Sequence, residues 1–303
     1  MNKYIYVIGF IFTGIIMSIV KKDIKLDIFT LYFISVTIIG LTFIIKYINK
    51  NNVDDKKEKK NIKELITKEG LILAITGTIG WLGSIYVLKE LPLSIALPLG
   101  SISLFIAMGF EKLLLHKNID ITTILIFILF IIGLLLVNLH SLKVGRFNYY
   151  LIILLILYTT CQAFQNVYTK KLLDNYNSDE IIIMEYIITI CFAIILCMIN
   201  YKQFFNSTKK YKSIIFMIII VLIFRNVRTY SRLKGIENLD VDEWNLLSRL
   251  TIIISIIIGY FYYNEYISIQ KILGAIIILF SIYLLKSENY HHTLHNIFHI
   301  PYV

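Results

Sequence analysis

Residues 243–285 read EWNLLSRLTIIISIIIGYFYYNEYISIQKILGAIIILFSIYLL, two apolar runs separated by a short polar break. Each run is about 20 residues long, the length that an α-helix needs to cross a hydrocarbon core of about 30 Å. The apolar residues are continuous and do not alternate with polar ones, so the runs favour helices over barrel strands. This stretch predicts two membrane-spanning helices.

The same pattern recurs along the whole chain. Of its 303 residues, 57% are hydrophobic and 17% are charged, whereas a soluble domain carries about 25% charged residues. We therefore predict an all-α integral membrane protein with ten transmembrane helices. The predicted helices cover residues 4–20, 28–45, 71–88, 92–110, 121–139, 149–168, 181–201, 214–231, 243–262 and 267–285.

The basic residues predict the orientation of the chain. With ten crossings, 16 Lys and Arg fall on the N-terminal side, 11 on the opposite side and 3 inside helices. The positive-inside rule then places both termini in the cytoplasm, and leaves open whether the host is a plasma membrane or an endomembrane. The net charge of +10 flanks apolar spans, which indicates contact with the lipid bilayer and not with nucleic acid.

The chain resembles itself at a spacing of about 147 residues. LPLSIALPLGSISLFIAMGF at 91–110 corresponds to LDVDEWNLLSRLTIIISIIIGYF at 239–261. We predict a first five-helix repeat at 1–145, a second at 146–286 and a cytoplasmic tail at 287–303. Because five is odd, the second repeat enters the membrane from the other side, which makes the repeats inverted. The first repeat carries a charged loop at 46–69, expected to be loosely ordered with a short helix near 63–68.

Three stretches resemble the drug/metabolite transporter superfamily: 86–105, 159–173 and 233–285. Glu265, followed nine residues later by Gly274, is similar to the ending of EamA-type members. Asn245-Leu246-Leu247-Ser248-Arg249 resembles the Asn-x-x-Lys-Arg of triose-phosphate and nucleotide-sugar carriers, with serine in place of the lysine. The resemblance implies a secondary carrier with its substrate site between the two repeats. Glu265 itself is expected to cap the start of the tenth helix.

Arginines within the spans are the first candidates for a site. Arg225 and Arg228 share one face of the predicted eighth helix with Arg232, at spacings i, i+3 and i+7, and Arg249 lies inside the ninth. An arginine facing lipid costs several kcal/mol, so these side chains should face a wet cavity or a partner. They predict a clamp for carboxylate or phosphate. The alternative is structural pairing with Glu185, Asp242 or Glu243, or snorkelling to headgroups.

A polar stripe on the sixth helix supplies further candidates. It contains Gln162, Gln165 and Asn166, which favour cavity lining over helix–helix contact. Asn245 and Thr13 are added as binding candidates. Pro98 should kink the fourth helix by freeing a backbone carbonyl, and it is a further site candidate because such a break often lines the site of a carrier; the alternative is a purely structural kink. Glu185 is a possible coupling carboxylate.

These observations predict a secondary transporter that works by alternating access on a small polar metabolite. The substrate is expected to be an organic anion or zwitterion, such as a phosphorylated metabolite or nucleotide sugar. An intramembrane enzyme or a non-transporting receptor or scaffold is the alternative, but the sequence has no HExxH or GxSxG motif. No cofactor is predicted. His291, His295 and His299 are read as part of an interfacial tail and not as metal ligands, and a homodimer is left open.

Overall fold

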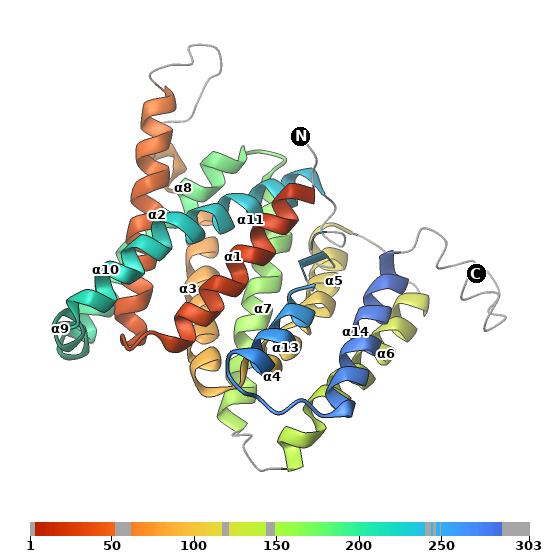
Figure 1. Cartoon of the computed structure of the whole chain (residues 1–303). Helices are drawn as coiled ribbons and strands as arrows, with labels where there is room; N and C mark the ends of the chain where they lie inside the picture. The colour runs from red at the N-terminus through yellow and green to blue at the C-terminus, as the bar shows by residue number, and fades with distance from the viewer. Residues whose placement is uncertain are drawn as a thin grey trace.

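The computed structural model describes residues 4–51, 62–116, 121–143, 149–239, 244, 247–248 and 250–286. Within these residues every regular element is helical (Figure 1). The elements are α1 (Tyr4–Asp23), α2 (Ile28–Asn51), the 3₁₀ turn η1 (Ile62–Leu65), α3 (Lys68–Glu90), α4 (Leu93–Gly100), α5 (Ser103–Leu114), α6 (Ile121–Lys143), α7 (Tyr149–Leu172), α8 (Ser178–Ile199), α9 (Tyr201–Thr208), α10 (Tyr211–Ile220), the π-helical turn η2 (Val221–Arg225), α11 (Asn226–Asn238), α13 (Thr251–Phe261) and α14 (Ile269–Lys286).

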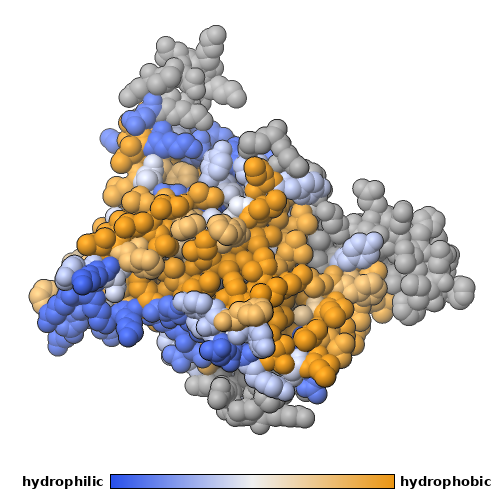
Figure 2. Space-filling model, in the orientation of Figure 1, coloured by the Kyte–Doolittle hydropathy of each residue, from blue (hydrophilic) through white to orange (hydrophobic). Residues whose placement is uncertain are grey.

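Seven helical segments are long and apolar enough to cross a membrane, and three shorter apolar helices accompany them. The seven are Tyr4–Asp23, Ile28–Asn49, Lys68–Glu90, Leu93–Leu114, Tyr149–Leu172, Ser178–Ile199 and Tyr211–Asn238; the three are Ile124–Val137, Thr251–Phe261 and Ile269–Ser281. Figure 2 shows the resulting surface, a broad apolar band over α1 and α10 with hydrophilic residues at its edges. Such a band is the surface that a helix bundle presents to lipid.

Several boundaries differ from the prediction. Helix α2 continues to Asn51, so the charged loop begins later than residue 46. Helix α3 begins at Lys68, three residues earlier than expected, because the Thr67 hydroxyl accepts a hydrogen bond from the Gly70 amide at 3.2 Å and caps it. The predicted short helix is the turn η1, and α9 was not predicted. Residues 52–61 and the tail 287–303 lie outside the described residues.

Two of the spans are interrupted. The fourth is divided into α4 and α5 at Ser101–Ile102, just beyond the Pro98 at which a kink was predicted. There the amides of Ser101 and Ile102 bond three residues back, to Pro98 and Leu99, in place of the α-helical pattern. The eighth span contains the π turn η2, which widens the helix between α10 and α11. Both interruptions border the central cavity described below.

The main helix contacts between the two halves recur when the halves are exchanged. Matching α1, α2, α3, α4–α5 and α6 in order with α7, α8, α10–α11, α13 and α14 gives five equivalent positions. Helix α6 packs on α14, α2 on α8 and α4 on α13, and each of these pairs joins equivalent positions. Helix α3 packs on α7, and the exchanged pair, α11 on α1, is also present. The interface between the halves is therefore built from two related sets of contacts.

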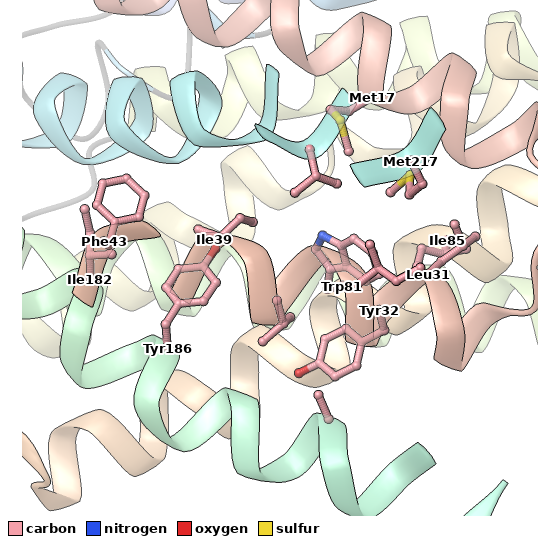
Figure 3. Packing of buried hydrophobic residues seen from close by; sticks show 14 of the residues in the cluster. Met17, Leu31, Tyr32, Ile39, Phe43, Trp81, Ile85, Ile182, Tyr186 and Met217 are labelled. Carbon is pink, nitrogen blue, oxygen red and sulfur yellow. The ribbon is translucent and has the colours of Figure 1, made fainter. Parts of the chain in front are cut away.

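At the α6–α14 contact the two backbones approach each other closely. A Cβ atom on Gly274 would lie 2.6 Å from the Gly133 carbonyl oxygen, and one on Gly133 would lie 2.9 Å from that of Gly274. Small residues allow this approach, as is usual between membrane helices. The main apolar core lies elsewhere, where Met17, Trp81 and Met217 join residues of α2 and α8 (Figure 3).

Candidate functional site

A cavity of about 190 Å³ lies at the centre of the bundle and is lined by both halves. Helices α1, α3, α4 and α5 contribute from the first half, and α7, α8, η2, α11 and α13 from the second, together with Trp244 and Ser248. The described lining residues include four basic side chains, Lys21, Arg225, Arg228 and Arg232, and one carboxylate, Glu185. Their net formal charge is therefore +3.

The π turn η2 and helix α11 present the three arginines. Arg225 is the last residue of the π turn, and Arg228 and Arg232 follow on the same face of α11. The Asn226 amide bonds to the Val221 carbonyl, five residues back, which closes the wide turn just before this face begins. π turns are rare and occur often at functional sites. All three arginines line the cavity, as expected from their i, i+3 and i+7 spacing.

Arg232 is neutralised. Its Nη2 lies 3.1 Å from Glu185 Oε2, and its Nη1 donates to Gln165 Oε1 at 2.9 Å. Gln165 Nε2 in turn donates to Glu185 Oε1 at 2.8 Å. These three side chains, which we call the paired triad, connect α7, α8 and α11 in a closed set of hydrogen bonds. For Arg232 the structural pairing considered from the sequence is therefore the observed arrangement.

Arg225 and Arg228 form no ion pair with any described residue. Arg228 Nη1 donates to the Gly14 carbonyl oxygen at 3.3 Å, and its guanidinium lies 4.8 Å from the centre of the Phe10 ring. The Arg225 guanidinium lies 5.4 Å from the centre of the Trp81 ring. The aromatic faces stabilise the cations by about 0.5–2 kcal/mol each without neutralising them. Both guanidinium groups keep donors that can bind an anion.

Lys21 adds a cation that sequence reasoning missed, because it was counted among the residues flanking the first span. The residue is 5% exposed. Its Nζ donates to Ser84 Oγ at 3.0 Å and lies 4.5 Å from the centre of the Trp81 ring. A signal was present: Gly14, Ser18 and Lys21 are small or polar residues at helical spacing and all line the cavity.

The sequence matches the EamA-like transporter family over residues 4–139 and again over 150–287. These two matches span nearly the whole chain, one in each half. The chain belongs to the EamA-like transporter family. It is thus a multi-pass integral membrane protein of a family of transporters and not of enzymes.

Other comparisons add the fold alone. A solved crystal structure, described only as that of a protein, has a TM-score of 0.59 and 13% sequence identity, covering 94% of this chain and 95% of the other. At that identity the likeness extends to the fold and not to a substrate. No curated protein gives a significant match.

The remaining predicted site residues of this EamA-like transporter have different outcomes. Gln162, Gln165 and Asn166 line the cavity, as does Glu185. Thr13 is buried but does not line it, because it lies off the face of α1 formed by Phe10, Gly14 and Ser18, and its hydroxyl donates to the Gly9 carbonyl oxygen at 2.6 Å.

Three further predicted residues do not appear in the described lining. Pro98 is buried and is not among the lining residues, whereas Leu97 and Gly100 on either side of it are. Asn245 and Arg249 lie outside the described residues.

Glu265, which carries part of the family resemblance, caps a different helix from the one expected. Its carboxylate accepts hydrogen bonds from the amides of Leu93 at 2.8 Å and Ser94 at 3.1 Å, at the start of α4. Lys22 Nζ lies 3.8 Å from the same carboxylate and donates to the Leu91 carbonyl oxygen at 3.0 Å. These contacts connect the end of α1, the start of α4 and the α13–α14 loop. They hold these three segments together at the end of α1 that carries Lys21.

Proposed function

We propose that this protein carries a small organic anion, or an anionic zwitterion, across the membrane by alternating access. The observation that carries the proposal is the net charge of +3 in the described cavity lining, with three of the four cations lacking a carboxylate partner there. Desolvating an uncompensated charge in a membrane protein is costly, so such charges mark a substrate or ion site. A bound anion supplies the missing compensation.

The size of the cavity restricts the substrate. Pockets for drug-sized ligands are about 300–1,000 Å³, and this cavity is about 190 Å³. A small phosphorylated metabolite or a short carboxylic acid fits that volume better than a nucleotide sugar does. Aromatic walls from Phe10, Trp81 and Tyr158 add apolar contact for the carbon skeleton.

The exchange symmetry of the helix packing supports ten spans in two inverted five-helix repeats, 1–145 and 146–286, followed by a tail at 287–303. Two polar contacts repeat at matching positions. Lys22 Nζ donates to the Leu91 carbonyl oxygen, and Lys170 Nζ donates to the Leu239 carbonyl oxygen, each at 3.0 Å. Lys170 follows Lys22 in the sequence by the same number of positions as Leu239 follows Leu91. In the proposed mechanism the two halves rock around the cavity and open it to each side in turn.

The basic residues of the loops support cytoplasmic termini. Two of the basic residues that flank the predicted spans, Lys21 and Arg232, line the cavity and are not loop charges. Arg232 belongs to the N-terminal side and Lys21 to the opposite side. Leaving both out therefore does not change the excess of basic residues on the N-terminal side. Glu185 remains a candidate for coupling, and it would have to release Arg232 to take up a proton.

Uptake into proteoliposomes tests the proposal. Uptake of small organic anions should fall at least about tenfold in Arg225→Gln and in Arg228→Gln, because a hydrogen bond to a charged group contributes about 1.5–3 kcal/mol. Lys112→Gln is the matched control, since Lys112 is an exposed lysine at the end of α5. Its uptake should equal that of the wild type. Unchanged uptake in both arginine variants, or transport of cations alone, contradicts the proposal.

A further inference from the structure

Lys21, Trp81 and Arg225 form a cluster around one indole ring. The Lys21 ammonium lies 4.5 Å and the Arg225 guanidinium 5.4 Å from the centre of that ring. Trp81 is 7% exposed, and its indole N–H has no acceptor among the described residues. The Arg225 Nε is also buried and has no acceptor there. The cluster therefore presents two cations and a neutral donor, all lining the cavity.

Lys21, Arg225 and Arg228 have more N–H donors than they have hydrogen bonds to described residues. An ammonium has three N–H donors and a guanidinium has five. Across the described part of the chain, Lys21 donates to Ser84 Oγ, Arg228 donates to the Gly14 carbonyl oxygen, and Arg225 has no side-chain hydrogen bond. Ser84 Oγ itself donates to the Trp81 carbonyl oxygen at 2.8 Å, so its own proton is already used. The unused donors all belong to groups that line the cavity.

The number of uncompensated cations bears on the valence of the ligand. Lys21 and Arg225 contact the same indole ring and line one cavity with Arg228, so their positive charges repel one another. One negative charge would leave two of the three cations uncompensated in a site of low dielectric constant. A ligand with two or three negative charges would neutralise most of the excess, and the cavity of about 190 Å³ limits it to a few carbon atoms.

We propose that the Lys21–Trp81–Arg225 cluster, together with Arg228, is an anion subsite that selects a compact ligand with at least two negative charges over a singly charged one. Phosphate monoesters and short dicarboxylates have this chemistry. The inference rests on the proposed function and adds the valence of the substrate. It also adds Lys21 and Trp81 as binding residues.

The test is a thermal-shift titration of the full-length protein in detergent at constant ionic strength. Succinate and butyrate have the same number of carbon atoms but different charge, and glycerol 3-phosphate supplies a phosphate dianion. Ligands that bind the folded state raise the melting temperature according to their affinity. At least one dianion should bind at least about tenfold more tightly than butyrate, and Lys21→Gln should remove that preference. Lys25→Gln, which removes an exposed lysine beyond the end of α1, should retain it.

The outcomes separate the inference from the proposed function. Equal affinities for butyrate and both dianions, or a full preference retained by Lys21→Gln, overturn this inference alone. Stabilisation by none of the anions overturns it together with the proposed function. Should Lys21→Gln fail to fold, the comparison of valence in the wild-type protein still decides the question. Lys21→Arg, which keeps the charge, should keep the preference for the dianion.

Discussion

Two groups of charged residues in the cavity lining differ in how their positive charge is compensated. In the paired triad, Arg232, Glu185 and Gln165 bond to each other and leave no net charge. The second group, Lys21, Arg225 and Arg228, contacts aromatic rings and neutral oxygens but no described carboxylate. A paired cation holds helices together, whereas an unpaired one is available to a ligand. We therefore assign a structural role to the paired triad and a binding role to the second group.

Removing the carboxylate from the paired triad should have the largest effect on stability. Glu185→Gln leaves Arg232 without its partner and raises the net charge of the described lining from +3 to +4. Breaking a buried ion pair costs about 3–5 kcal/mol. Because this pair is partly exposed, the expected loss of unfolding free energy is about 3 kcal/mol. Chemical denaturation in detergent measures it.

A double variant serves as the control for this loss. Glu185→Gln with Arg232→Gln removes both charges, so its loss should be smaller than the sum of the two single losses. A Glu185→Gln protein as stable as the wild type would show that the paired triad is not structural.

Two glutamines of α7 test the same comparison with a smaller expected loss of stability. Gln165 bonds to both charged members of the paired triad, whereas Gln162 has no hydrogen bond to a described residue. Gln165→Leu should therefore lower the free energy of unfolding by about 1–2 kcal/mol. Gln162→Leu, the matched change on the same helix, should stay within about 0.5 kcal/mol of the wild type. Equal losses of unfolding free energy in the two variants would show that the paired triad is no more important for stability than the rest of the cavity lining.

Removing an unpaired cation should cost less stability than removing a paired one. Arg228→Gln discards a charge that has no carboxylate partner in the described structure, so the ligand-free protein should lose less than about 1 kcal/mol or become more stable. Its thermal unfolding without ligand, compared with that of Arg232→Gln, provides the measurement. A loss for Arg228→Gln as large as that for Arg232→Gln would indicate that Arg228 is also structural.

Much of the fold follows from the sequence because each span has to satisfy its own backbone within lipid. Continuous apolar runs locate the helices, and the i, i+3 and i+7 spacing of the three arginines places them on one face whatever the neighbours are. The stripe of Gln162, Gln165 and Asn166 is readable for the same reason. The family resemblance carried by Glu265 and Gly274 also agrees with the family match.

The rest depends on tertiary contacts that no local pattern contains. Lys21 stands where an apolar run ends, and a lysine there can extend to the headgroups or turn inward. The choice is made by Ser84 and Trp81 on another helix. Likewise, the helix that Glu265 caps is decided by the α13–α14 loop meeting the start of α4, 172 residues earlier in the chain. Among the described residues, Arg232 is paired and Arg225 and Arg228 are not, because Glu185 of α8 lies beside Arg232.

Both tryptophans of the chain, Trp81 and Trp244, line the cavity, so intrinsic fluorescence reports directly on its occupancy. We predict a saturable change when the wild-type protein is titrated with glycerol 3-phosphate or succinate. The midpoint should rise at least about tenfold in Arg228→Gln. A diamine with the same number of carbon atoms as succinate, 1,4-diaminobutane, should give no saturable change. Saturation with the diamine and none with either anion would contradict the claim that unpaired cations make this cavity a site for anions.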